Sequence, residues 1–116
     1  MNTLRDRTKA FALRVIRLFS ALPKSDVGRV LGRQMLQSGT SVGAHCREGY
    51  RSRSDAELIS KYETALQELD ETTYWLELLA DAGVVSARRL APLVGEASEL
   101  IAILVTSVKT IKRRRH

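Results

Sequence analysis

Apolar residues recur at alternating spacings of three and four residues in four separate stretches of the chain. That period places the side chains on one face of an α-helix, and it does not suit a strand, whose period is two. The clearest series is Leu90, Leu93, Ala97, Leu100, Leu104, Val108 and Ile111. A chain made of such stretches buries its apolar faces by packing helix against helix.

Local signals indicate where the four predicted helices begin and end. The stretch "SDAE" at 54–57 is a capping box, in which Ser54 caps the first turn and Glu57 returns to the Ser54 amide. Pro23 disfavours helix at the residue before it, and Gly83 suits the left-handed position that follows a helix. We therefore predict helices at about 3–22, 26–52, 55–82 and 87–113.

At 116 residues the chain suits a single domain. Because short turns join the helices, we predict an all-α, up-down-up-down four-helix bundle over residues 1–116, with part of the basic tail at 112–116 disordered. No uninterrupted apolar run reaches 18 residues, and the start, "MNTLRDRTKAF", does not resemble a signal peptide. These features predict a cytoplasmic protein that does not enter a membrane.

The glycine-rich stretch "SGTSVGAHCREG" at 38–49 keeps the helical period in two ways. Its polar seam consists of Gln34, Ser38, Ser41, His45 and Glu48. Its apolar series consists of Val27, Leu31, Met35, Val42 and Cys46. Each glycine costs a helix about 0.5–1 kcal/mol, so tight packing must compensate. We predict a continuous helix buried on more than one side, with Glu48 buried or half-buried beside arginine, histidine or hydroxyl partners.

His45, Cys46 and Glu48 invite an enzymatic or metal-binding interpretation, which the spacing argues against. Adjacent helical residues point in different directions, so His45 and Cys46 do not form a nucleophile and its base. A di-iron site in a bundle needs a second Glu-x-x-His pair, and the other histidine is the terminal His116. We therefore predict no catalytic residue, no metal and no cofactor, and the lone cysteine forms no intramolecular disulfide.

The net charge of +6 is unevenly distributed. Residues 55–82 carry eight acidic side chains against Lys61 alone, and the other segments are basic. In the predicted topology, the start of the first helix, the end of the second and the end of the fourth share one end of the bundle. Eleven basic residues lie at that end: Arg5, Arg7, Lys9, Arg47, Arg51, Arg53, Lys109, Lys112, Arg113, Arg114 and Arg115.

Three interpretations of this basic end remain open. A nucleic-acid backbone would relieve the mutual repulsion by counterion release, which gives salt-sensitive binding with little sequence preference. An acidic protein could dock there instead. The tail could also be a solvated extension that only favours the helix C-terminus.

The few aromatic residues offer two further candidate contacts. Trp75 points about 100° away from its neighbour Leu76 on a helix, towards an edge, where Tyr74 and Trp75 could pack within the chain or against another subunit. Tyr50 lies beside Arg47 and Arg51 in sequence and is the better candidate for contact with a nucleobase.

Residues 22–83 resemble a known bacterial family of four-helix bundles. It includes proteins encoded by intervening sequences in 23S ribosomal RNA genes and the accessory variability determinant (Avd) of diversity-generating retroelements. The residues that match its pattern are Pro23, Gln34, Ser38, Ser41, Gly43, Glu48, Glu71, Thr72, Tyr74, Trp75 and Leu76. His45 departs from the pattern, which usually has asparagine there, and Cys46 replaces a residue that is often aromatic or aliphatic.

The resemblance implies a ring-like homopentamer with a positively charged surface and no known catalysis. In the retroelement branch it implies binding to nucleic acid and to a reverse transcriptase. Our leading hypothesis is therefore a non-enzymatic, oligomeric protein that binds the backbone of RNA or DNA, or acts as a scaffold. The alternative is an adaptor that docks an acidic partner such as a reverse transcriptase or another polymerase.

Overall fold

The computed structural model describes residues 3–114, and this part of the chain contains four α-helices and no strand. They are α1 (Leu4–Ala21), α2 (Asp26–Tyr50), α3 (Asp55–Asp81) and α4 (Ala87–Arg114). The four predicted helices are confirmed, with ends that differ by two residues or fewer. The helix α4 continues through residues 112–114 of the basic tail, where the sequence allowed disorder, and residues 115 and 116 lie outside the described part.

Side-chain caps begin all four helices, at Thr3, Ser25, Ser54 and Ser86. The Thr3 hydroxyl accepts from the Asp6 amide, and the Asp6 carboxylate accepts from the Thr3 amide, which completes a capping box. The predicted box at α3 is only half formed, because the Ser54 hydroxyl accepts from the Glu57 amide but the described Glu57 side chain does not return the bond. After α3, Gly83 has the expected left-handed conformation, with φ of 75°.

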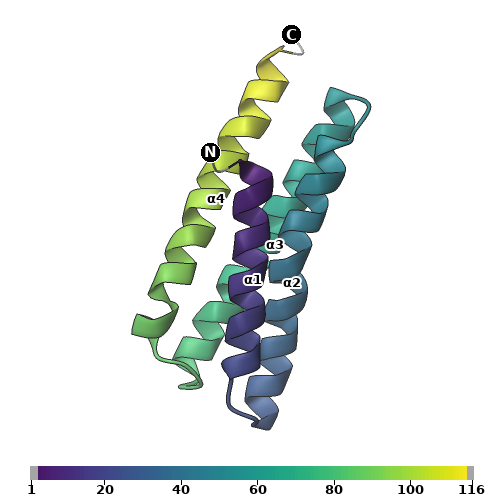
Figure 1. The fold of residues 1–116 in the computed structure, drawn as a ribbon. Coiled ribbons are helices and arrows are strands. Elements are labelled where there is room, and N and C mark those ends of the chain that lie inside the picture. Colours follow the sequence, from purple (N-terminus) through teal and green to yellow (C-terminus); the bar gives the residue numbers. More distant parts are fainter. Residues whose placement is uncertain (1–2, 115–116) are drawn as a thin grey trace.

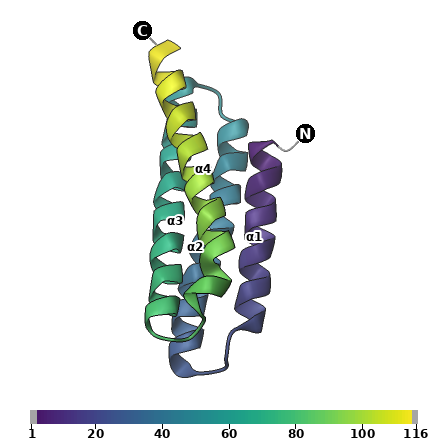
Figure 2. The ribbon, with the colours of Figure 1, turned by 90° about the vertical axis from the view of Figure 1, so that its left-hand side faces the viewer.

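Each helix runs antiparallel to the one before it (Figures 1 and 2). The most extensive pairing is between α2 and α3, and among the neighbouring pairs α1 and α4 contact each other least. With 18 residues α1 is the shortest helix, so the α2–α3 turn and the end of α4 extend past its first turn (Figure 1). This difference in length determines which of the basic residues at this end of the bundle lie close to one another.

The core follows the predicted periodicity most faithfully in α4, where all seven residues of the predicted series are buried. In α3 the helical spacing of Leu58, Tyr62, Ala65, Leu69, Thr73, Leu76 and Leu79 predicts the inward face. Ala65, Leu69, Leu76 and Leu79 are buried as predicted, but Ile59 and Thr72 are buried in place of their neighbours Leu58 and Thr73. The assignment of Val27 to the core is wrong, because its side chain is 53% exposed. At the first turn of α2 the inward position belongs to Gly28.

Two glycines in α2 permit the close approach of α1. A Cβ atom on Gly32 would lie 2.7 Å from Leu22 Cδ1, and one on Gly39 would lie 2.9 Å from both Cγ atoms of the buried Val15. Both distances are shorter than side-chain contacts allow. The tight packing that the glycine-rich stretch predicted is therefore present, and the stretch is continuous helix.

The helix α4 is long and apolar enough to cross a membrane by length and composition alone. Of its most apolar 18-residue stretch, 28% is buried inside the protein, and Glu96 within α4 forms an ion pair with Arg7. A single such helix is weak evidence for a membrane span.

Candidate nucleic-acid interface

The polar seam of α2 is only partly an internal feature. Ser38 is buried, and its Oγ lies 2.8 Å from the Oγ1 of the buried Thr72 on α3. The Ser41 hydroxyl instead donates to the Gln37 carbonyl of its own helix, at 2.7 Å, and Gln34 is exposed. One buried hydroxyl pair therefore connects α2 to α3, and the rest of the seam reaches solvent along the edge of that contact.

Glu48 lies at the outer end of the seam with its side chain 50% exposed. Its main partner is Lys61 of α3, whose Nζ donates to Oε2 at 2.9 Å, where the sequence predicted arginine, histidine or hydroxyl partners. This hydrogen bond, followed by the charge of Lys61, lowers the pKa of the Glu48 carboxyl. His45 Nδ1 lies 3.5 Å from the other carboxylate oxygen and has no hydrogen-bond partner in the described structure.

Cys46 is buried, with 2% of its surface exposed, and burial raises the pKa of its thiol to about 11. A nucleophilic cysteine needs the opposite shift, which a nearby cation or base would supply. Within residues 3–114, no three side chains of His, Cys, Asp or Glu are placed to hold a metal ion. The arrangement around His45 and Cys46 is therefore suited to packing.

The raised pKa of Cys46 predicts a loss of stability in alkaline solution. The unfolded thiol ionises near its usual pKa of 9.0 and the folded thiol near 11, so the unfolded state loses its proton first as the pH rises. We expect the free energy of unfolding to fall by about 2 kcal/mol more between pH 9 and 11 than in Cys46→Ala. Urea unfolding of both proteins across that range measures it, and parallel pH profiles would contradict it.

Four of the predicted basic residues line one groove between α1 and α2. Arg5 and Lys9 come from α1, Arg47 comes from the last turn of α2, and Arg51 is the residue that directly follows this helix. The groove has a volume of about 450 Å³, and we call it the α1–α2 groove. Gly43 forms part of its wall, where a Cβ atom would lie 3.5 Å from the Thr8 backbone oxygen.

The α1–α2 groove is strongly positive. None of its four basic side chains forms an ion pair with a carboxylate of the described residues. Its one acidic residue, Glu48, is neutralised by Lys61 from the adjacent helix. The groove therefore offers an anion several cations that no internal partner already satisfies.

The other predicted basic residues lie elsewhere. Arg7 turns towards α4 and pairs with Glu96 at 2.7 Å, so that it stabilises the contact between α1 and α4. Lys112 pairs with Glu63 at 3.5 Å, and Arg114 pairs with Asp55 at 2.8 Å. Three more residues are exposed outside the groove, namely Arg53, Lys109 and Arg113. Arg115 lies outside the described residues.

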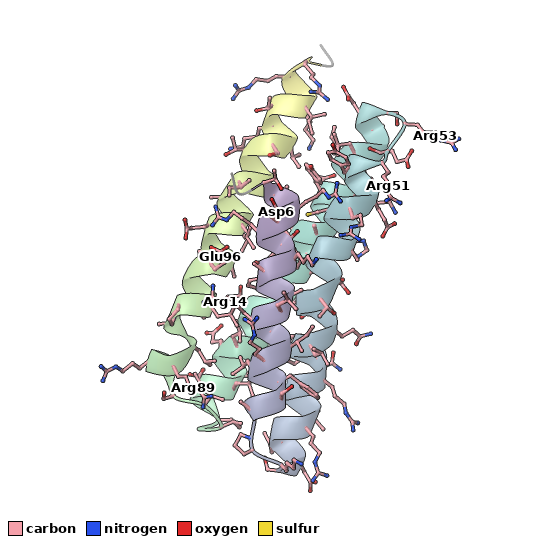
Figure 3. The ribbon with its side chains drawn as sticks, in the orientation of Figure 1. Asp6, Arg14, Arg51, Arg53, Arg89 and Glu96 are labelled. Atoms are coloured by element: carbon pink, nitrogen blue, oxygen red, sulfur yellow. The ribbon has the colours of Figure 1, made fainter. Side chains whose placement is uncertain are left out.

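A second basic cavity was not foreseen from the sequence. Arg14 and Arg17 of α1 and Arg89 of α4 line a cavity of about 470 Å³ at the other end of the molecule, and Figure 3 labels Arg14 and Arg89 there. Its remaining walls are mainly apolar, with Leu18, Leu90 and Leu93 among them. The antiparallel order of the helices places the end of α1 near the start of α4. This order, which the sequence predicted, was the signal from which the second basic cavity could have been found.

The aromatic residues fall into two sites. The Tyr50 ring at the end of α2 is 69% exposed, and the Arg5 guanidinium carbon lies 5.2 Å from its centre. Trp75 on α3 is partly buried against the core, and its Nε1 is buried without a partner among the described residues. Its neighbour Tyr74 is 52% exposed, so the predicted subunit interface at these two residues stays a prediction.

Comparisons with known proteins agree with one another. The family model described as "23S rRNA-intervening sequence protein" matches residues 2–106. A crystal structure from Bacteroides thetaiotaomicron, of a protein with unknown function from the S23 ribosomal protein family, superposes with a TM-score of 0.87 and 33% sequence identity. The match covers 92% of this chain and 99% of that one. No curated protein gives a significant match.

Proposed function

We propose, because this chain belongs to the 23S rRNA-intervening sequence protein family, that it is a non-enzymatic protein that binds the backbone of RNA or DNA. The observation that carries the proposal is the α1–α2 groove, where Arg5, Lys9, Arg47 and Arg51 face one opening without carboxylate partners of their own in the described structure. The proposed contact surface is therefore this groove and not the whole basic end of the molecule.

The chemistry of these four side chains suits phosphate. Arginine presents several N–H donors in a planar fork that fits phosphate oxygens, and lysine adds a point charge. Backbone contacts of this kind position a nucleic acid without reading its sequence. The proposed ligand is therefore recognised by charge density along a strand, which also suits a scaffold that gathers RNA or DNA.

The salt dependence of binding tests this function. Four phosphate contacts predict a slope of log K against log [salt] of about −3 for a single strand and about −4 for a duplex. Fluorescence anisotropy with labelled RNA and DNA of mixed sequence, from 50 to 200 mM salt, measures the slope. Failure to bind either polymer at 50 mM salt would contradict the proposal and favour the adaptor that docks an acidic protein such as a reverse transcriptase.

We also propose that the protein assembles into a ring-like homopentamer in the cytoplasm. One feature of the surface supports self-association. The exposed face of α4 carries the small residues Ala91, Gly95, Ala102 and Thr106, which permit the close approach of another helix.

The molecular mass in solution tests the assembly. A chain of 13.0 kDa predicts a species of about 65 kDa for five copies, which sedimentation velocity distinguishes from a monomer. Gly95→Leu, which adds bulk where no atom lies within 4 Å in the single chain, is expected to reduce the assembled fraction without unfolding the bundle. A monomer at 100 µM would contradict the proposal.

A further inference from the structure

We propose that the cavity beside the α1–α2 groove receives an unpaired nucleobase, so that the preferred ligand is a single strand. This inference rests on the proposed function and specifies its ligand. The cavity lies between the start of α1 and the end of α2, with a volume of about 550 Å³, within the range of small-ligand sites. Its lining consists of Thr3, Leu4, Arg5, Asp6, Cys46, Tyr50 and Tyr62. We call it the tyrosine cavity.

The tyrosine cavity and the α1–α2 groove adjoin at one residue. Arg5 lines both, and its guanidinium also packs over the ring of Tyr50. A nucleotide joins a phosphate to a base over a short distance, so one nucleotide can place its phosphate in the groove and its base in the cavity. Arginine suits such a border position, because its flat cation pairs with phosphate and also stacks on aromatic rings.

The groove and the tyrosine cavity differ in charge, as expected if the groove holds the phosphate and the cavity holds the base. The groove holds four cations and one carboxylate, Glu48, which Lys61 already neutralises, whereas the tyrosine cavity has one cation, Arg5, and one carboxylate, Asp6. Hydrogen bonds from Thr3 lower the pKa of the Asp6 carboxyl, so it stays ionised at neutral pH. A fixed carboxylate repels a phosphate, but it accepts hydrogen bonds from the amino groups of bases.

The walls of the tyrosine cavity offer flat and apolar surfaces. Tyr50 is largely exposed, and Tyr62 of α3 is partly buried against Gly49, where an added Cβ atom would lie 3.0 Å from the Tyr62 ring. Cys46 adds a thiol that remains protonated at neutral pH. Bases stack on tyrosine rings with little sequence preference, whereas a base inside a duplex is already stacked and paired. Only an unpaired base can therefore enter.

Abasic strands separate the base contact from the phosphate contacts. Two single-stranded DNAs of about 16 nucleotides, one with mixed bases and one with abasic residues, carry the same phosphates. Anisotropy titrations at 100 mM salt are expected to show about tenfold tighter binding of the strand with bases, the value of one stacked base. Tyr50→Ala is expected to remove this difference and leave the salt slope unchanged, and Tyr50→Phe to keep it.

The control is Val30→Ala, which shortens an exposed apolar side chain of α2 that lies outside both the tyrosine cavity and the α1–α2 groove. It should preserve the preference for bases. Equal binding of the two strands by the unchanged protein, or a preference that survives Tyr50→Ala, would overturn this inference and leave backbone binding intact. If neither strand binds at 50 mM salt, the proposed function fails as well.

Discussion

Replacing Arg47 and Arg51 together by glutamine is expected to weaken binding to duplex DNA about 60-fold at 0.1 M salt. Each phosphate contact contributes about 0.9 to the log–log salt slope, which corresponds to about eightfold in affinity at this salt concentration. Both residues are exposed, Arg47 on the last turn of α2 and Arg51 directly after it, and both line the α1–α2 groove. Anisotropy titrations should also show that the slope falls by about 1.8.

The same helix offers a matched control. Arg29 and Arg33 are exposed on the first half of α2, have the same spacing of four residues, and lie outside the α1–α2 groove. The double substitution Arg29→Gln and Arg33→Gln lowers the net charge equally, so it should weaken binding only slightly. If both double variants lose affinity to the same degree, the net charge of the protein governs binding and the groove has no special role.

The helices of this protein could be predicted because their signals are local. The apolar period, the caps at Ser25 and Ser54, and the left-handed Gly83 all lie within a few residues of the features that they determine. The error at Val27 shows the limit of such signals. Periodicity predicts which face of a helix is apolar, but it does not show where a neighbouring helix ends. In the first turn of α2 the buried residue is Gly28, and Val27 is exposed.

The basic site could be predicted only in part, because residues were grouped by helix end and not by helix face. Arg5 and Lys9 are four residues apart and share a face of α1, whereas Arg7 points almost to the opposite side and pairs with Glu96 of α4. Arg47 and Arg51 have the same spacing of four at the end of α2, where Arg51 is the C-cap. The groove thus consists of two such pairs on antiparallel neighbours, a pattern that the sequence already contained.

Ion-pair partners required the three-dimensional structure. Glu48 and Lys61 lie on different helices, and nothing in their sequence spacing shows that they meet. The same holds for Lys112 with Glu63 and for Arg114, which reaches Asp55 across the end of the bundle. These pairs depend on the relative lengths of the helices, and they explain why much of the basic tail is already neutralised within the chain.

Gly39→Leu is expected to lower the free energy of unfolding by about 2 kcal/mol. At this position even a Cβ atom would lie 2.9 Å from two atoms of Val15, a fully buried residue of α1 that cannot move aside. Overpacking of a core contact costs about 1–3 kcal/mol and occasionally more, which exceeds the gain of about 1 kcal/mol in helix propensity. Urea unfolding followed by circular dichroism measures the loss.

Gly43→Leu provides the matched comparison one turn further along α2. Its Cβ atom would lie 3.4 Å from the Thr8 hydroxyl oxygen, an ordinary contact, and the position borders the open α1–α2 groove. Stability should therefore stay level or rise by about 0.5–1 kcal/mol, because leucine replaces glycine within a helix. The added side chain would instead occupy the groove, so nucleic-acid binding should weaken while the fold remains. Equal stability losses in the two variants would mean that the approach of α1 to α2 is not tighter at Gly39 than at Gly43, and that the glycines of α2 have another role.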